Sequence, residues 1–560
     1  MRLFGKGKSA RLLVVLMSAV LVAGACGGDD DDEGAEPEET GEDGGTVEGG
    51  TLTFGADQDF AGYNKLTSKD NSLAGGQIMR QVWPSAYRAR PDFSLEPYVI
   101  AQDAAVVGES PFVVEWKIRP EANWDDGVPI SADDFEYVAA TCNGKNKDAD
   151  CADTSGYDLV TKIEKPDPKT IRLTFKQPYA DYKRLFEIVP SHIAKQRGGG
   201  DPIKGWNTGF DTDPGASGGP WKVAERVKGD SLTLVRNDKF WGKKPSLEKI
   251  IFRFLPESLT QPDALRNGEV KMIYPQPQLD QVQLVEEIQN VHSEINFGPT
   301  FEHLTLNFKN EFLAVPEVRQ ALALGVDRQA IVDTLMKPFS DKASQLDNRV
   351  LVSTQKGYQA NGPTFVKRDV AKATGLLEKA GFTKGDGGVY EKGGKKLSLR
   401  LSTTSGNDLR EQQGVLIQGQ LKDIGIDIRI ANAKADTLFG ELLPKGDFDI
   451  ANFAWVGTPF PASGASQLYS SASDSNYGKY ANPAVDKLML EAVGEIDETA
   501  RLALLDKIDE AMWADLPNIP LYQKPTFLAY YESYANITDN TTTESPFWNS
   551  EEWALKASAK

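Results

Sequence analysis

Cys26 is the first residue in this sequence whose type and position could do chemistry. It directly follows the small residues 23–25, and an apolar run from Leu12 to Val22 comes before them, behind four basic residues. This order is typical of a secretion signal whose cysteine receives a diacylglyceryl group after cleavage. The run is too short to span a bilayer comfortably, and no stop-transfer pattern follows, so an uncleaved anchor is disfavoured. We expect residues 1–25 to be a lipoprotein signal peptide, with the mature chain held by lipid at the extracellular face of the cell membrane.

Cys142 and Cys151 are the other two cysteines of the chain, and they lie in a segment rich in Gly, Asn and Asp. In an exported protein, two cysteines this close favour a disulfide. Closing so short a loop contributes on the order of 2 to 3 kcal/mol in the chain-entropy model. Since the spacing is not C-x-x-C, a redox role is disfavoured.

One pattern would fit a hydrolase, the G-x-S-x-G match around Ser217. A nucleophile elbow needs a strand before it and a helix after it, but a Pro-Gly loop precedes Ser217 and a proline and a strand follow it. Of the three histidines, His192, His292 and His303, none has a sequence neighbour that suggests a base oriented by a carboxylate. We therefore expect no enzyme and no catalytic residue. The scarcity of His and Cys also argues against a metal site, and no cofactor is expected.

Residues 26–50 contain eleven acids and no base between Asp29 and Glu48, with almost nothing apolar. Such a segment cannot bury enough surface to fold, and like-charge repulsion favours an extended acidic tether. A metal site in the Asp run is disfavoured because hard cations need spaced carboxylates in a shaped loop. The net charge of the whole chain, −19, argues against nucleic acid as a partner.

The folded region is expected to begin at residue 51, where apolar and polar residues start to alternate. The first half predicts strands, one hairpin and a helix that Ser131 caps. The strands are 51–60, 112–119, 170–175 and 249–255, the hairpin is 221–238, and the helix is 131–142.

The second half alternates between the helical period and the strand period, which is the pattern of an α/β domain with a mixed sheet. The predicted helices are 316–336, 369–382, 408–426 and 499–513, and the predicted strands are 303–310, 396–403, 427–433, 448–455 and 516–531. The last predicted strand follows the strand-rich pattern of the first half. We therefore expect the chain to end in the domain where it began.

Several segments, in order along the chain after residue 50, carry a resemblance to a known family. They are WDDGVPISADDF (124–135), GGPWKV (218–223), LTLVRNDKFWG (232–242), LTLNFKN (304–310), VPEVRQALALGVDRQAIV (315–332), YANPAVDKLM (480–489) and IPLYQ (519–523). Each alone has an ordinary structural reason, such as a turn, a cap or core packing. Together they resemble the extracellular solute-binding proteins, family 5, which are substrate-binding lipoproteins of peptide and nickel ABC importers.

The resemblance implies an α/β protein with the two-lobed periplasmic-binding-protein-like fold, of the large type with an inserted subdomain, mixed sheets and a hinge. It divides the folded chain into lobe I (51–95, 206–298 and 516–560), an inserted subdomain of lobe I (96–205) and lobe II (299–515). It implies a monomer that captures an oligopeptide or dipeptide by hinge closure and delivers it to the permease subunits and cytoplasmic ATPases of an importer.

Aromatic and amide residues at strand ends are the candidates for ligand contact, because an extended peptide can pair with strand edges while its side chains enter tolerant pockets. They are Phe60, Tyr63, Asn64, Asn307, Phe308, Trp455, Thr458 and Phe460. Trp455 is the strongest of them, since aromatic anchors dominate binding sites.

Thr458 marks a departure from the resemblance. In many peptide-binding members, an Asp a few residues after the tryptophan that matches Trp455 pairs with the α-ammonium of the peptide. Thr458 has a hydroxyl and no charge, so either another acid replaces the Asp or the ligand has no free α-amino group. Asp57, Asp59 and Asp447 are the candidate replacements. The departure leaves two further readings open: import of a non-peptide solute, and a lipoprotein that senses or hands over a glycan or lipid.

Overall fold

The computed structural model describes residues 45–257 and 260–559. Residues 45–560 group as one compact unit. The predicted signal peptide, Cys26 and most of the predicted tether lie outside the described residues. Within the described part, no helix is both long and apolar enough to cross a membrane.

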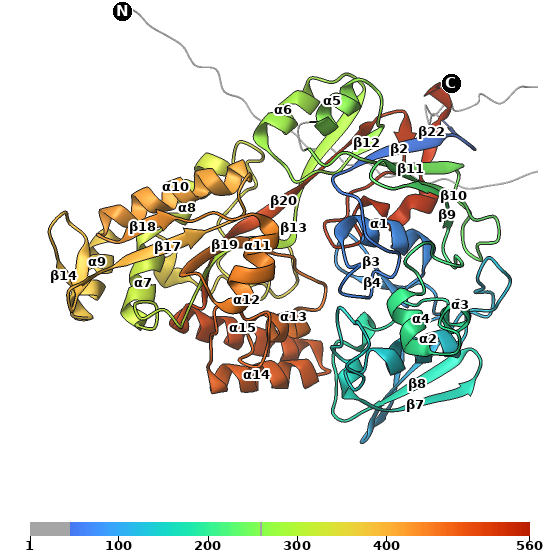
Figure 1. Cartoon of the computed structure of the whole chain (residues 1–560), viewed down its shortest axis with the longest axis horizontal. Helices are drawn as coiled ribbons and strands as arrows, with labels where there is room; N and C mark the ends of the chain where they lie inside the picture. Colours follow the sequence, from blue (N-terminus) through green and yellow to red (C-terminus); the bar gives the residue numbers. More distant parts are fainter. Residues whose placement is uncertain (1–44, 258–259, 560) are drawn as a thin grey trace, which may run out of the picture. The chain divides into compact units, whose positions relative to one another are not determined.

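A single mixed sheet organises the described chain (Figure 1). Its ten strands run in the order β18-β17-β19-β13-β20-β12-β2-β11-β10-β9. In that order they are Asp427–Ile430, Ser398–Ser402, Ile450–Trp455, Val291–Leu306, Asn518–Tyr531, Met272–Ile273, Thr51–Ala56, Lys249–Phe254, Ser231–Arg236 and Trp221–Val227. The sheet therefore joins strands from both halves of the sequence.

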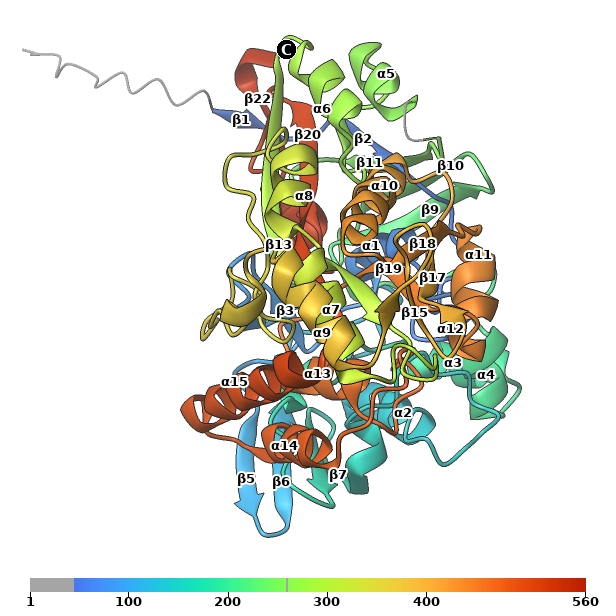
Figure 2. The same ribbon diagram turned by 90° about the vertical axis from the view of Figure 1, so that its left-hand side faces the viewer.

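β13 and β20 are the long strands that connect the two parts of this sheet. They pair antiparallel from Val291↔Tyr531 to Thr305↔Asn518, with register shifts between Phe297 and Phe301 and between Glu302 and His303. Beyond β13 lie β19, β17 and β18, and beyond β20 lie β12, β2 and β11. Figure 2 shows the two strands side by side along their length.

Four smaller sheets complete the strand structure. They are β1 (Thr46–Val47) with β22 (Ala554–Lys556) and β21 (Tyr534–Ala535); β3 (Tyr87–Ala89) with β4 (Leu95–Pro97); β5 (Ala105–Glu109), β6 (Phe112–Lys117), β8 (Thr170–Phe175) and β7 (Val160–Asp167); and β14 (Thr383–Lys384), β15 (Tyr390–Lys392) and β16 (Lys395–Lys396). The strand β1 lies before residue 51, where the sequence predicted the fold to start. The C-terminal strand β22 supplies its partner, with Thr46 opposite Lys556.

The α-helices flank these sheets. They are α1 (Leu73–Val82), α2 (Ala132–Thr141), α3 (Ser191–Arg197), α4 (Pro202–Thr208), α5 (Thr260–Arg266), α6 (Leu279–Glu286), α7 (Pro316–Gly325), α8 (Arg328–Leu335), α9 (Val370–Lys379), α10 (Asp408–Asp423), α11 (Ala435–Thr437), α12 (Leu443–Lys445), α13 (Pro461–Tyr469), α14 (Pro483–Gly494) and α15 (Glu498–Asp515). The 3-10 helices are η1 (Tyr157–Leu159), η2 (Tyr182–Arg184), η3 (Pro363–Phe365), η5 (Pro546–Glu552) and η6 (Ala557–Ala559), and η4 (Leu438–Leu442) is a π-helix.

Two large hydrophobic cores lie in different parts of the chain. The first gathers buried residues from Leu52 to Phe254, with Met272 and residues 528–553 from the end of the sequence. The second gathers residues 304–522. The C-terminal segment thus packs with the N-terminal one.

Local sequence explains where several elements begin. Ser131 caps α2 in a capping box, in which the Asp134 carboxylate accepts from the Ser131 backbone N–H. The sequence-predicted hairpin forms from β9 and β10, and Gly229 at its turn has φ of +77°, a conformation that glycine tolerates best.

A disulfide joins Cys142, at the end of α2, to Cys151, with an S–S distance of 2.03 Å. It closes a loop with a sequence separation of 9. The segment that follows the disulfide, residues 152–155, contributes to the lining of a pocket of about 550 Å³.

Candidate functional site

Trp455 ends β19 at the centre of an aromatic stack. Its ring is nearly parallel to those of Tyr477 and His303, with centroids 5.8 and 6.0 Å away, and Phe453 meets it edge-on at 5.0 Å. The half-buried indole is therefore fixed in place, and the chain leaves β19 at a defined point. Val456, the next residue, is 59% exposed.

Thr458 shapes the loop between β19 and α13. Its hydroxyl accepts from the Phe460 N–H at 3.2 Å, and its carbonyl accepts from Gln355 Nε2 at 3.2 Å. Gly457 lies so close to β13 that a Cβ there would be 2.3 Å from the Pro299 carbonyl oxygen. The loop residues 456–458, which we call the β19 loop, are thus held against the crossing strand.

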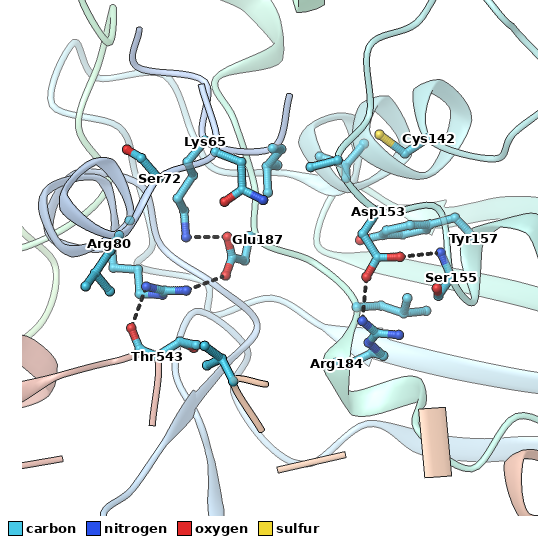
Figure 3. Close-up of a pocket in the computed structure, with 18 residues that line it drawn as sticks. Lys65, Ser72, Arg80, Cys142, Asp153, Ser155, Tyr157, Arg184, Glu187 and Thr543 are labelled. Atoms are coloured by element: carbon cyan, nitrogen blue, oxygen red, sulfur yellow. Dashed lines mark hydrogen bonds and ion pairs between the residues drawn. The ribbon is translucent and has the colours of Figure 1, made fainter. Parts of the chain in front are cut away.

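A pocket of about 550 Å³ lies where the β19 loop meets the N-terminal part of the chain. Figure 3 shows its lining. Val456 contributes from the β19 loop, and the other lining residues come from the first half and from the C-terminal segment. Those that carry a charge are Lys65, Arg80, Asp153, Arg184 and Glu187. The apolar lining includes Leu66, Leu73, Val138 and Leu185.

Two groups of ion pairs lie on separate sides of this pocket (Figure 3). Glu187 pairs with Lys65 and, at 3.7 Å, with Arg80. Arg80 Nη1 also donates to the Thr543 carbonyl at 2.6 Å. On the other side, Asp153 accepts from Arg184 Nη2. Both carboxylates that line the pocket are therefore already paired with cations.

Burial controls the charge on Lys65. Loss of solvent lowers the pKa of Lys65 to about 8, Arg80 acts in the same direction, and Glu187 opposes it. Burial also works against the charged form of Glu187, but Lys65 and Arg80 hold its pKa below the ordinary value. The pocket wall thus places a lysine whose pKa is lowered to about 8 beside a glutamate whose pKa is held below its ordinary value.

A second pocket of about 520 Å³ lies along β13 and β20. Its lining includes Glu294 and Asn296 of β13, Gln523 of β20, and Asp539. Burial raises the pKa of Asp539, while Thr526 and Asn296 donate hydrogen bonds to it.

Phe60, Tyr63 and Asn64, which the sequence suggested for ligand contact, are buried in the first core. Phe60 meets Tyr63 edge-on at 5.2 Å, and the guanidinium of Arg226 lies 3.8 Å from the centroid of Phe60. The Asn64 amide donates to the Trp206 carbonyl at 2.9 Å. These three side chains are therefore occupied by contacts that hold the turn after β2.

Asn307 and Phe308, the candidates after β13, also make internal contacts. Asn307 Nδ2 donates to the carbonyls of Gly446 and Phe448, at 3.0 and 2.7 Å. Phe308 packs edge-on against Tyr480. Neither lines the 550 Å³ pocket, whereas the loop that contains Thr458 borders it through Val456. Phe460 provides the N-cap position of α13.

The acids considered as replacements for the missing Asp lie elsewhere. Asp59 pairs with Arg226 at 2.9 Å, and Asp447 pairs with Arg400 at 2.8 Å. Burial raises the pKa of Asp57. None of the three lines the 550 Å³ pocket or the small pocket that Thr458 borders.

Sequence reasoning missed the charged wall of the pocket. Arg80 lies in the last turn of α1, a helix whose other residues are mostly buried, and a cation in such a helix is a usable signal. Lys65, Arg184 and Glu187 carried no comparable signal, because each lies in a loop or a short turn where a charged residue is ordinarily solvated.

The structure corrects the expectation that no histidine has a carboxylate partner. His192 does have a carboxylate partner, since its Nε2 lies 2.7 Å from Asp126 Oδ2. Ser217 takes no part in this pair: its hydroxyl is buried and donates to backbone carbonyls, with the Trp221 oxygen at 2.6 Å. The contact between His192 and Asp126 joins residues far apart in sequence, which is why their spacing could not reveal it.

Comparison with known proteins gives a consistent result. The oligopeptide-binding protein OppA of Mycobacterium tuberculosis is 28% identical over 88% of this chain and 82% of its own length. The oligopeptide-binding protein AppA of Bacillus subtilis is 25% identical over 91% of this chain and 92% of its own. The solved structure of the periplasmic EDTA-binding protein EppA superposes with a TM-score of 0.87 at 28% identity, covering 91% of this chain and 98% of that one.

These likenesses confirm the predicted fold class, an α/β protein with mixed sheets and the periplasmic-binding-protein fold. The model of the bacterial extracellular solute-binding proteins, family 5 Middle, matches residues 100–477, which is more than half of the chain. Together with the mixed sheet and the pocket beside the β19 loop, this match establishes that the chain belongs to the family 5 extracellular solute-binding proteins.

Proposed function

We propose that this protein captures an oligopeptide or dipeptide outside the cell membrane and delivers it to an ABC importer. The observation that carries the proposal is the 550 Å³ pocket, bordered by the β19 loop on one side and the N-terminal part of the chain on the other. Its volume is within the range of about 300–1,000 Å³ that small-molecule sites occupy. Relatives named as oligopeptide-binding proteins support a peptide as the solute.

The position of β13 and β20 supports capture by hinge closure. These strands carry the chain between the two cores, so a change of twist near the register shift between Phe297 and Phe301 would move one core relative to the other. A solute in the pocket would touch both sides only when they approach, and its binding energy would favour that arrangement. We propose the predicted boundaries of lobe I, its inserted subdomain and lobe II as the moving parts.

A lipid on Cys26 would keep the captured solute near the importer. The proposal gives the mature protein an acidic tether between the lipid and the folded unit that begins at residue 45. It also treats the protein as a monomer that meets the permease subunits of its importer.

A non-peptide solute is the second candidate, and two observations favour it. Thr458 stands where a charged partner for an α-ammonium was expected, and the pocket wall carries three cations. The structurally similar protein EppA is named for binding EDTA, which has several carboxylates and no peptide bond.

Native mass spectrometry of the lipid-free protein, purified from its own host, tests the proposal. Release and sequencing of a ladder of short peptides would support peptide capture. A single non-peptide species, or peptides that neither co-purify nor raise the melting temperature when added, would contradict the peptide as the solute.

A further inference from the structure

The strand β13 is irregular at the point where it passes between the two cores. Phe297 lies opposite Pro525 of β20, and Phe301 lies opposite Gln523, so residues 298–300 face a single residue of β20. We call residues 298–300 the β13 bulge. Extra residues of this kind bend a strand and increase its local twist.

Two side chains of β20 show that the β13 bulge lies between the cores. Tyr522, on one side of it, is buried in the second core, and Leu528, on the other side, is buried in the first. Packed cores deform little, so a change in the angle between them has to be taken up by the segment that joins them.

The β13 bulge is in close contact with the β19 loop. A Cβ at Gly457 would overlap the Pro299 carbonyl oxygen, so the two backbones cannot come nearer to each other. Gly457 directly follows Val456, which lines the 550 Å³ pocket. A movement of Pro299 towards the loop would therefore displace Val456 as well.

The other end of the β13 bulge touches the C-terminal segment of the chain. A Cβ at Gly298 would overlap the side chain of Thr541, two residues before Thr543, which lines the same pocket. Neither Gly298 nor Gly457 has a positive φ, so close approach is the reason that each position suits a residue without a side chain. The bulge thus adjoins the pocket border on two sides.

Gln523 of β20 joins the β13 bulge to the segment that precedes η3. Its Nε2 donates to the Gly298 carbonyl at 2.9 Å, and its Oε1 accepts from the Ser353 N–H at 3.1 Å. The side chain is buried, so both hydrogen bonds form away from solvent. Gln523 therefore holds residue 353 at a fixed place relative to the bulge.

Gln355 continues this connection to the β19 loop. Its Oε1 accepts from the Val352 N–H at 3.0 Å, and its Nε2 donates to the Thr458 carbonyl at 3.2 Å. The two glutamines and residues 352–355 between them form one hydrogen-bonded path from β20 to the β19 loop. This path reaches the same loop that Pro299 touches directly.

We propose that the β13 bulge positions the β19 loop, so that the angle between the two cores and the place of Val456 at the pocket change together, with Gln523 and Gln355 as positioning residues. The inference rests on the proposed function, since it states how movement at the hinge reaches the pocket. Coupling of this kind is reciprocal, so a change in the loop also changes the angle between the cores.

Hydrogen exchange of the solute-free protein tests the positioning. Mass spectrometry of peptides that cover residues 453–464 reports on the β19 loop. The variants are Gln523→Met, Gln355→Met and the double variant, because Met has a similar length and no amide. Circular dichroism melting curves establish that each variant folds.

Gln418→Met is the matched control. The Gln418 amide also donates to a backbone carbonyl, that of Ile428 at 2.7 Å, but Ile428 belongs to β18 at the end of the ten-stranded sheet. Any general effect of losing one glutamine hydrogen bond on exchange would appear in this variant as well.

Gln523→Met should raise exchange in the β19 loop about 5- to 10-fold, although its own hydrogen bonds are to the β13 bulge and to residues 353 and 354. Gln355→Met should have a similar effect, and the double variant should exceed neither, since both changes interrupt one path. Independent contributions would instead multiply, to about 25- to 100-fold.

The reverse direction is tested by Gly457→Ala, in which the new methyl group pushes the loop away from Pro299. Electron-paramagnetic-resonance distances between spin labels at Lys162→Cys of β7 and Lys487→Cys of α14, both exposed positions, report on the angle between the two parts of the chain. Gly457→Ala should shift the distance distribution. Gly464→Ala is the control, because its Cβ would lie 3.9 Å from Thr458 Oγ1, an ordinary contact.

The labelled protein begins at residue 27, so its native cysteines are Cys142 and Cys151, which are joined in a disulfide. Labels therefore attach at the introduced positions. No solute is added in either experiment, so a failure of peptides to bind would contradict the proposed function and leave these results unchanged.

Three results would overturn the inference: exchange in the β19 loop of Gln523→Met that matches Gln418→Met, effects of the two glutamine variants that multiply, or a distance distribution in Gly457→Ala that matches Gly464→Ala.

Discussion

Thr458 stabilises the β19 loop without adding a charge to it. Its hydroxyl accepts from the Phe460 N–H two residues on, which closes a turn just before α13. An Asp side chain can close such a turn as well as Thr does. The absence of a carboxylate at position 458 is therefore not required by the local fold.

Thr458→Asp should change which peptides bind while leaving the loop intact. Because a carboxylate here would border the small pocket that Thr458 lines, we expect peptides with a free amino terminus to gain at least about tenfold in affinity over their N-acetylated forms. Calorimetry with matched free and acetylated peptides measures the ratio. Thr458→Ser is the control, and an unchanged ratio in Thr458→Asp would place the amino terminus elsewhere.

His303 should make stability depend on pH in mildly acidic solution. Burial lowers its pKa to about 3, against 6.5 in the unfolded chain. The unfolded state therefore binds a proton that the folded state excludes, and stability is lost as the pH falls from 6.5 towards 3.

This contribution should reach about 2 kcal/mol at pH 5. Urea unfolding of wild type and His303→Gln between pH 7 and pH 5 measures it, and the variant should lose less stability over this range. Equal slopes would show that His303 is not held neutral in the folded protein. His292→Gln is the control.

At the scale of single residues, the sequence could not predict which way a side chain points. Asn64 and Asn307 have the residue type and the position of ligand-binding amides, yet backbone carbonyls occupy both. Which carbonyl an amide meets depends on segments more than 100 residues away. The β19 loop was within reach of sequence reasoning because an aromatic strand end is a local feature.

At the scale of elements, the sequence predicted most strands and helices because their periodicity is local. Helix α10 and strands β6 and β8 begin at the predicted residues. The first twelve residues of the sixteen-residue strand β13, 291–302, were missed because they alternate poorly and are only half-buried towards the start of the strand. Its partner β20, rather than its own pattern, stabilises it as a strand.

The segment between α8 and η3 depends on a buried ion pair. Arg349 and Asp509 of α15 are both fully buried, with Nη1 3.2 Å from Oδ1, and Asn518 accepts from Arg349 Nε at 2.8 Å. The pair thus joins an irregular segment to a helix and to β20.

Arg349→Met should lower the free energy of unfolding by about 3–5 kcal/mol, because Asp509 would remain buried without its partner. Arg349→Met with Asp509→Leu should lose less, since no charge is then left unpaired. Urea unfolding of both proteins measures the difference. A double variant as unstable as the single one would show that the ion pair is not the cause.

At the scale of the whole molecule, α13 begins against a carboxylate from a distant part of the chain. Asp181 Oδ2 accepts from the Ser463 N–H at 2.8 Å, and Tyr179 lies 3.3 Å from the Ser463 hydroxyl. The Ala180 N–H donates to the Val493 carbonyl at 2.7 Å. This contact, from residues 179–181, adjoins Arg184 of the pocket wall.

Asp181→Ala should weaken solute binding about 5- to 30-fold, because it leaves the buried Ser463 N–H without an acceptor. With a solute that closes the wild-type protein, the radius of gyration of Asp181→Ala, measured by small-angle X-ray scattering, should be larger than that of the wild-type protein. Asp486→Ala, which removes an acceptor from Ser471 within one part of the chain, is the control. Equal affinity in both variants would show that the contact between residues 179–181 and α13 does not support solute binding.

The position of β20 in the sheet has a consequence for the order in which the chain folds. β20 lies between β13 and β12, so the strands on its two sides meet only through it, and it is the last long strand in the sequence. Tyr534, just after it, donates to the carbonyl of Thr51 across 483 residues. Contacts of such long sequence separation make folding slow, and until Asn518–Tyr531 is available β12 and β13 present unpaired edges. A chain synthesised from its N-terminus therefore completes its ten-stranded sheet only after nearly all of it has emerged.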